Sequence, residues 1–248
     1  MILVTGMHRS GTSLVCQLLA RLGEAVGDPA DRIPADRWNP AGYFEQRAVM
    51  DLNSRIVTGW PRNRSRAAAW LAKLRYLRMP SDAAIDARAA RHRAALQELA
   101  VLHAGCALKD PRFCLTLRFW LAAADVAHVV VCRRHPAAVV ASLVRRDRLP
   151  RGLAARFYAW HVERLLLQLP PARAVFVDVD ALAARNVAEL DALRRALALA
   201  PAPPSASLLT EVVRTEHWHD DAERAPCPPQ ALAAWQRLCD RAVTGGAT

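Results

Sequence analysis

Short, continuous apolar runs recur along the chain, and longer stretches of helical pattern separate them. A run of this kind is typical of a strand in a parallel sheet that is covered on both faces. Four such runs predict strands at residues 1–5, 105–108, 128–132 and 174–177.

Between these runs, apolar residues recur at helical spacing. The pattern predicts helices at residues 14–22, from 43 through 53, 67–104, 115–123, 137–146, 154–169 and 186–199. The longest stretch is interrupted at residues 79–81, where Ser81 can cap the second half. Because strands and helices alternate, we expect an α/β fold in which a parallel sheet carries helices on both faces.

The pattern also bears on domain organisation. No internal repeat or linker divides the chain, so we expect residues 1–248 to form one domain. Prolines and glycines at 201–204, 226–229 and 245–246 predict a loop-rich tail, frayed from about residue 240 to residue 248.

Composition limits the class of partner. The formal net charge of +11 favours anionic ligands. The arginines are scattered, however, and their densest groups, at 62–66 and 145–148, accompany no nucleic-acid-binding motif. We therefore expect no nucleic-acid partner.

Several features bear on where the protein works. No apolar run approaches the length of a membrane span, and no basic, apolar leader precedes the first strand. The six cysteines form no C-x-x-C pair, which fits a reducing compartment. We expect a cytoplasmic protein that has no membrane partner.

The first predicted strand leads into a glycine-bounded loop, Gly6–Ser13, and then into a helix. The loop keeps the glycine spacing of the ATP/GTP phosphate loop, G-x-x-x-x-G-K-[ST], but Thr12 stands where that motif has lysine. A phosphate loop without this lysine indicates a nucleotide whose transferred group is handled differently.

Three predicted strands end in polar clusters: Arg9–Ser10, Lys109–Arg112 and Arg133–Pro136. The carboxyl ends of parallel strands meet at one edge of a sheet, where open α/β sheets bind their ligands. The convergence of these clusters predicts a site for a multiply charged anion.

These segments resemble the sulfotransferases that use 3′-phosphoadenosine 5′-phosphosulfate (PAPS). The loop to Ser13 is similar to the family's 5′-phosphosulfate loop, with His8 in place of the usual proline and Arg9 at the basic position. A strand followed by Arg134, with Ser142 eight residues later on the next helix, is similar to the family's 3′-phosphate segment.

Two further segments support the resemblance. Lys109–Pro111 resembles a strand end of the tyrosylprotein branch, and residues 39–45 resemble a segment common in bacterial members. The matched segments span residues 2 to about 146, with a looser match to about 199. The resemblance implies a P-loop-like sulfotransferase fold, no requirement for metal, and adenosine 3′,5′-bisphosphate (PAP) as the nucleotide product.

The resemblance also assigns roles to residues. The cofactor-binding residues that it implies are His8, Arg9, Ser10, Gly11, Thr12, Ser13, Arg134 and Ser142. Arg9 and Lys109 are the candidate cations for the transition state, because charge grows on the leaving phosphate oxygen. Glu45 is the candidate general base, with His8, Asp110 and His135 as alternatives.

Structural explanations stay open for several of these residues. The loop could be an ordinary strand-to-helix turn, Lys109 and Asp110 could form a surface salt bridge, and Glu45 could stabilise the first turn of a helix. His8 could replace proline for steric reasons alone. Residues 217–221 contain two histidines and two aspartates, and we favour a solvated loop over a metal site there.

The acceptor is the least defined part of the hypothesis. We expect a hydroxyl, less readily an amine, on a small molecule, carbohydrate or natural product. Trp38 and Trp60 flank the Glu45 segment and are candidates for an acceptor pocket, and Arg146 shares a helical face with Ser142. A homo-oligomer stays open.

Two other functions also remain open. One is a P-loop kinase or NTPase with a degenerate loop, against which Thr12 and the lack of a second strand ending in a metal-binding aspartate both argue. The other is a non-catalytic nucleotide-binding module.

Overall fold

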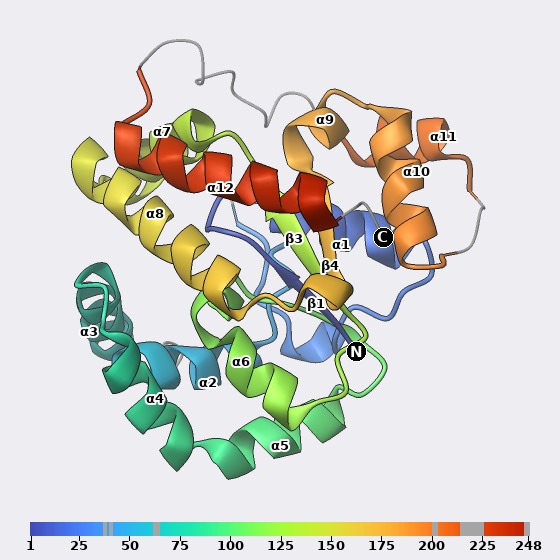
Figure 1. The fold of residues 1–248 in the computed structure, drawn as a ribbon. Coiled ribbons are helices and arrows are strands. Elements are labelled where there is room, and N and C mark those ends of the chain that lie inside the picture. Colours follow the sequence, from blue (N-terminus) through green and yellow to red (C-terminus); the bar gives the residue numbers. More distant parts are fainter. Residues whose placement is uncertain (37–38, 40–41, 62–64, 200–202, 214–225, 246–248) are drawn as a thin grey trace.

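The four predicted strands form one parallel sheet in the computed structural model, which describes residues 1–36, 39, 42–61, 65–199, 203–213 and 226–245 (Figure 1). The strands are β1 (Ile2–Thr5), β2 (Ala107–Lys109), β3 (His128–Arg133) and β4 (Ala174–Asp178). Their order across the sheet is β2-β1-β3-β4, so β1 is an inner strand. In the pairing register, Val4 lies opposite Lys109 and Thr5 lies opposite Val131. The polar ends of the first three strands therefore meet at one edge, as the sequence predicts.

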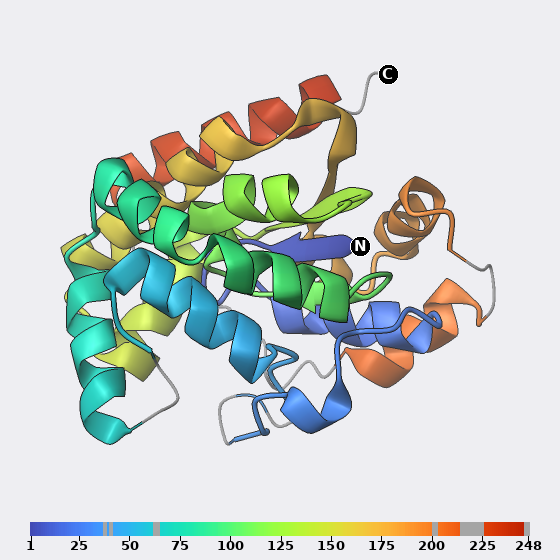
Figure 2. The same cartoon turned by 90° about the horizontal axis from the view of Figure 1, so that it is seen from below.

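Helices cover both faces of this sheet. Those of the first half are α1 (Thr12–Arg21), α2 (Arg47–Thr58), α3 (Arg66–Leu77), α4 (Asp82–Arg91), α5 (Arg93–Leu102) and α6 (Phe113–Ala123). Those of the second half are α7 (Pro136–Asp147), α8 (Arg151–Gln168), α9 (Val179–Ala183), α10 (Val187–Ala196), α11 (Ser205–Val212) and α12 (Pro229–Gly245). Both views of the ribbon show α12 lying along α8, and α1 beside α11 on the other side of the sheet (Figures 1 and 2).

Successive residues of each strand face opposite layers. Leu3 and Val129 point into a core shared with α2 and α4–α8, whereas Val4 and Val130 point into a core shared with α1 and α9–α11. All four side chains are fully buried. This two-sided burial is why the strands appear in the sequence as continuous apolar runs instead of alternating ones.

Several helix boundaries differ from the sequence-based prediction. Helix α2 begins at Arg47 instead of residue 43, because Phe44 has a φ of 63°, which a right-handed helix does not allow. Ser81 caps α4 as predicted, by accepting a hydrogen bond from the amide of Ala84. The long stretch has a second break at His92, with a φ of −111° and a ψ of 15°, between α4 and α5.

The tail differs more. We predicted loops from residue 201 onward, but α11 and α12 both lie in this region, and Ala231, Ala234 and Leu238 of α12 pack into the core beside α8. Residues 240–245, expected to fray, belong to the last turns of α12. Prolines mark the start of this helix, because Pro229 is its first residue.

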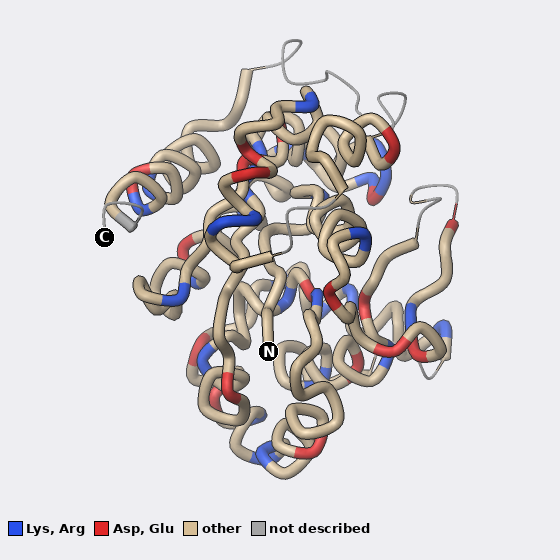
Figure 3. Tube along the Cα trace, turned by 90° about the vertical axis from the view of Figure 1, so that its right-hand side faces the viewer, with Lys and Arg blue, Asp and Glu red and all other residues tan. Residues whose placement is uncertain are grey.

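Charged side chains are spread over the whole trace. Figure 3 shows Lys and Arg interspersed with Asp and Glu along the trace. No helix in the described part of the chain is both long enough and apolar enough to cross a membrane.

Candidate functional site

The loop between β1 and α1 depends on two glycines. A Cβ on Gly6 would lie 2.6 Å from the carbonyl oxygen of Cys132 and 2.5 Å from Oγ of Ser10, so no side chain fits there. Gly11 adopts a left-handed φ of 76° and serves as the N-cap of α1. The chain thus turns sharply out of the sheet and directly into a helix.

The first turn of α1 is open to a ligand. No side chain caps this helix, and among the described residues no hydrogen bond from the backbone amides of Gly11, Thr12 or Ser13 is found. Unsatisfied amides at a helix N-terminus, aided by the helix dipole, bind phosphate-like anions. The described geometry thus fits the anion-binding loop that the sequence predicts better than an ordinary strand-to-helix turn.

Arg9 connects this loop to the residues predicted for the second phosphate. Its Nε donates to Oγ of Ser142 over 2.9 Å, and its carbonyl oxygen accepts from Nη1 of Arg134 over 3.0 Å. Arg134 also lies 3.4 Å from the Asp180 carboxylate. Arg134 and Ser142, predicted to act as a pair, are therefore brought together around Arg9.

Positive charge is concentrated at this point. Burial lowers the pKa of Arg9 to about 10, and repulsion by Arg146 and Arg134 adds to the shift. Arg146 belongs to the same cluster and donates from Nη2 to the hydroxyl of Tyr43 over 2.7 Å. An entering anion would relieve this repulsion, which is the electrostatic property expected of a phosphate site.

Lys109 and Glu45 form a buried ion pair. Nζ of Lys109 lies 2.6 Å from Oε1 of Glu45 and also donates to the carbonyl oxygen of Tyr43 and to Oγ of Ser13. The second carboxylate oxygen of Glu45 has no hydrogen-bond partner in the described structure. Lys109 pairs with Glu45 and does not form a surface salt bridge with Asp110. Glu45 precedes Gln46, the N-cap of α2, so it does not lie in the first turn of a helix. Both structural explanations considered from the sequence, a surface salt bridge and a first-turn glutamate, are therefore wrong.

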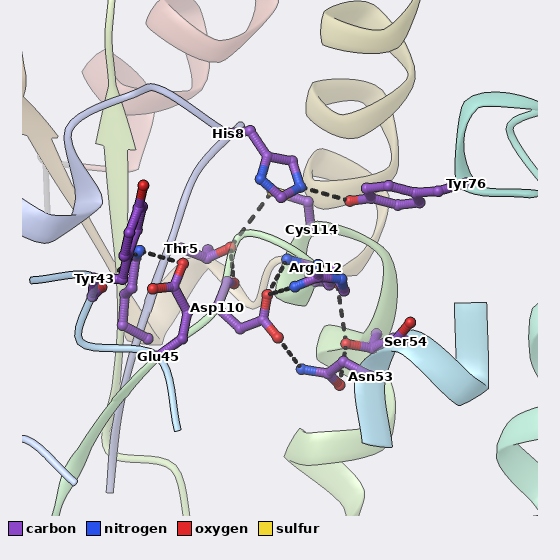
Figure 4. Close-up of polar contacts among 12 residues, drawn as sticks. Thr5, His8, Tyr43, Glu45, Asn53, Ser54, Tyr76, Asp110, Arg112 and Cys114 are labelled. Carbon is purple, nitrogen blue, oxygen red and sulfur yellow. Dashed lines mark hydrogen bonds and ion pairs between the residues drawn. The ribbon is translucent and has the colours of Figure 1, made fainter. Parts of the chain in front are cut away.

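Asp110 belongs to a separate, fully buried network. Its Oδ1 accepts from the amide and from Nη1 of Arg112, each over 2.9 Å, and its Oδ2 accepts from Asn53 over 3.0 Å (Figure 4). Asn53 in turn accepts from Thr116 and Trp120. With these contacts made, Asp110 holds the fold together and is a poor candidate for a general base.

The two histidine alternatives have different positions. Nδ1 of His135 accepts from the amide of Ala137 and so caps α7. The backbone amide of His135 donates to the Asp180 carboxylate. His8 belongs to the loop between β1 and α1, and its Nε2 lies 3.0 Å from the hydroxyl of Tyr76. Of these two residues, only His8 lines the cavity described next.

A cavity of about 350 Å³ opens beside the loop. Its charged and polar lining includes His8, Arg9, Glu45, Arg112 and Arg146, and its apolar lining includes Met50, Leu77, Leu143, Leu149 and Phe157. Such a mixture, in this range of volume, is typical of a small-molecule site.

The remaining candidates lie elsewhere. Trp60 is absent from the cavity lining and lies beneath the guanidinium of Arg75 instead, whereas Trp38 and residues 217–221 lie outside the described residues. Within the described part of the chain, no three His, Cys, Asp or Glu side chains gather as a metal site would require.

Sequence reasoning missed three residues that shape the site. Tyr43 contacts Lys109 through its carbonyl oxygen and Arg146 through its hydroxyl, although it belongs to a segment that we had singled out. Tyr76 and His161 lie on α3 and α8, far from any motif, and no signal in the sequence marks them.

Comparison with known proteins gives a consistent result. The family model described as "Sulfotransferase family" matches residues 2–204. No curated protein matches the chain. Two solved structures share the fold: the sulfotransferase domain from the Synechococcus PCC 7002 olefin synthase (TM-score 0.53, 16% identity, 96% of this chain and 94% of that chain), and the sulfotransferase domain from the curacin biosynthetic pathway (TM-score 0.52, 14% identity, 96% and 97%).

Proposed function

The chain belongs to the sulfotransferase family, and from that premise we propose that it transfers a sulfuryl group from PAPS to an acceptor hydroxyl. The observation that carries the proposal is the open first turn of α1 beside two cations, the half-buried Arg9 and the buried Lys109. The nucleotide supplies the sulfuryl group, and the protein supplies the charge that the transition state needs.

The residues of the loop fit the 5′-phosphosulfate. The amides of Gly11, Thr12 and Ser13 are available as donors, and Arg9 can grip an anionic oxygen with its guanidinium fork. Lys109 donates to Ser13, so its ammonium lies beside the same helix end. Lys109 and Arg9 would stabilise the negative charge that grows on the leaving phosphate oxygen.

The residues around Arg9 fit a second phosphate. Arg134 and Ser142 both contact Arg9, and the pKa of Arg9 is lowered by its burial and by the arginines around it. A 3′-phosphate would offset this excess of positive charge. We propose that Arg134 and Ser142 read this group, which separates PAPS from ATP.

The cavity supports a small-molecule acceptor. A volume of about 350 Å³, lined by leucines, a phenylalanine and charged groups, suits a compact molecule that carries both a hydroxyl and an apolar part. A natural-product or carbohydrate acceptor fits this description. Two cavity-lining groups could take the hydroxyl proton: Glu45, which the sequence indicates, and His8.

Ligand-dependent melting tests the donor. PAP without magnesium should raise the melting temperature, because a ligand that binds only the folded state stabilises it, and ATP should do little. The opposite ranking would contradict the proposal and favour an NTPase.

One structural detail bears on the NTPase alternative. Strand β4 ends in an aspartate, Asp178, contrary to the sequence-based prediction that no second strand ends in a metal-binding aspartate. Oδ1 of Asp178, however, accepts from the amide of Ala181 and so caps α9.

Product formation tests the transfer itself. The protein would be incubated with PAPS and a metabolite pool, and mass spectrometry would search for a gain equal to one SO₃ group. The control is the same pool with protein in which Arg9 is replaced. Binding of PAP without any sulfated product would favour a non-catalytic nucleotide-binding module.

A further inference from the structure

Three rings form a chain of hydrogen bonds that runs from the buried core to the cavity. His161 on α8 is fully buried, and its Nδ1 lies 2.7 Å from the carbonyl oxygen of Phe157. Its Nε2 lies 2.6 Å from the hydroxyl of Tyr76, which in turn lies 3.0 Å from Nε2 of His8. His8 lines the cavity, so the chain ends where an acceptor would bind.

The backbone carbonyl at the buried end sets the direction of every bond. A carbonyl oxygen only accepts, so Nδ1 of His161 must donate to Phe157. Burial lowers the pKa of His161 to about 3, so this ring is neutral and its Nε2 accepts from the hydroxyl of Tyr76. The hydroxyl has one hydrogen, and its oxygen therefore accepts from Nε2 of His8.

This sequence of bonds fixes the tautomer of His8. In the neutral ring, Nε2 carries the hydrogen and Nδ1 carries the lone pair. Figure 4 shows Nε2 directed at Tyr76 and the second ring nitrogen directed away from it. The ring itself is held by Phe157, stacked at 6.3 Å between centroids, and by Tyr76, edge-on at 5.6 Å.

We infer that His8 is the catalytic base of the transfer, with Tyr76 and His161 as the positioning residues that hold Nδ1 ready to accept a proton. This inference rests on the proposed function. As the acceptor oxygen bonds to sulfur, the bond between sulfur and the phosphate oxygen breaks and its electron pair stays on that oxygen. The hydroxyl proton passes to Nδ1 of His8 and is later released to water.

The hydrogen-bond chain suits this role. Gaining a proton at Nδ1 leaves the Nε2 hydrogen in place, so the bond to Tyr76 is kept and the new charge faces the phenolic oxygen. Glu45, by contrast, is bonded through Oε1 to Lys109. That contact gives Glu45 a positioning role, because it holds the Lys109 ammonium beside the loop.

The primary test uses His8→Gln. The side-chain amide nitrogen of glutamine can reach the place of Nε2 and donate to Tyr76, but glutamine offers no base. We expect the rate of formation of sulfated product at saturating PAPS to fall about 10²- to 10⁴-fold, the usual contribution of a general base. The Kd of PAP should change little, and the melting temperature should stay close to that of the wild type.

Chemical rescue separates a base from a structural residue. His8→Ala leaves a ring-sized space, and imidazole added to the buffer should restore part of the lost rate in proportion to its concentration. A loss of rate without rescue, in a variant that still binds PAP, would overturn the assignment.

Tyr76→Phe tests the positioning residues. It removes only the hydroxyl and should lower the rate about 10- to 100-fold, the range known for residues that orient metal-binding histidines by a hydrogen bond. Nitrogen NMR of labelled histidines supplies a readout that does not depend on the acceptor. The wild type should show His8 protonated at Nε2 alone, and Tyr76→Phe should show a mixture of tautomers.

The outcomes distinguish the two proposals. If the wild type transfers no sulfuryl group to any acceptor, the proposed function fails and the role of His8 fails with it. If the wild type is active and His8→Gln keeps most of that activity while Glu45→Gln loses it, only the assignment of His8 fails, and Glu45 is the base.

Discussion

Two arginines that line the cavity, Arg112 (buried) and Arg9 (half-buried), have opposite electrostatic surroundings. Arg112 is desolvated, which lowers its pKa, but the Asp110 carboxylate together with Tyr76 and Glu45 outweighs this effect and the net pKa is raised. Arg9 is half-buried, its neighbours include Arg146 and Arg134, and desolvation and repulsion lower its pKa to about 10. The first arginine has its anion within the fold, whereas the second sits in a region that an incoming anion would neutralise.

This contrast indicates that Arg112 stabilises the fold, whereas Arg9 is placed to bind an anionic ligand. A buried charge that loses its partner is costly, whereas removal of a charge from a repulsive cluster is not. A substitution that leaves Arg112 without its partner should mainly lower stability, whereas a substitution of Arg9 should mainly lower activity.

The largest effect is expected at Asp110. Asp110→Ala leaves Arg112 buried without its carboxylate and should lower the free energy of unfolding by about 3–5 kcal/mol, measured by chemical denaturation. The double variant Asp110→Ala/Arg112→Met removes both charges and should regain much of this loss. A single variant as stable as the wild type would show that the pair does not hold the fold together.

Arg9 should show the reverse. Arg9→Met should lower the rate of sulfuryl transfer by about 10²- to 10³-fold, since a charge aimed at the transition state is lost. The melting temperature of the ligand-free protein should stay the same or rise, because repulsion with Arg146 is removed. Arg9→Lys is the matched control that keeps the charge and loses the fork. A large fall in stability with activity retained would break the comparison.

Substitution of Arg134 tests whether the arginines around Arg9 bind the 3′-phosphate. Arg134→Ala removes a charged hydrogen-bond donor worth about 1.5–3 kcal/mol and should weaken binding of PAP by that amount in calorimetry. Binding of adenosine 5′-phosphosulfate, which lacks the 3′-phosphate, should change much less. Equal losses for the two nucleotides would show that Arg134 does not read the 3′-phosphate.

The smallest effect, per unit of pH, is expected at a third titratable group, the buried His161, which the fold keeps neutral. Burial lowers its pKa from 6.5 to about 3, so between these values the unfolded state binds one more proton than the folded state. Stability should therefore fall as the pH drops below 6.5, by about 1.4 kcal/mol per pH unit from this residue. His161→Gln should flatten the acid side of the stability profile by that slope, and an unchanged slope would contradict the buried neutral state.

The sequence predicted the framework of the fold well because burial on both faces leaves a strong signal. All four strands were found from their apolar runs, and the convergence of their polar ends followed from parallel order. The start of α2 was wrong because Phe44 takes a left-handed conformation that no local pattern marks. Helices α11 and α12 were missed because the prolines that surround them resemble loop signals.

The site was predicted in part. The loop, Arg9, Lys109, Arg134 and Ser142 were named from motifs, and the structure brings them to one edge of the sheet. Contacts between distant elements could not be predicted in the same way. The pairing of Lys109 with Glu45 and the bonds that link His8 to His161 through Tyr76 depend on how the helices pack, which a single sequence does not specify.

Arg9 has a further consequence for how two ligands would share this protein. Its side chain lines the cavity that we propose for the acceptor, and it also contacts Ser142, which we propose binds the nucleotide. One guanidinium would therefore contact both ligands. A ligand that fixes this guanidinium on one side also fixes it on the other. The two affinities are then thermodynamically coupled, and whatever factor the nucleotide imposes on the acceptor's Kd, the acceptor must impose on the nucleotide's Kd.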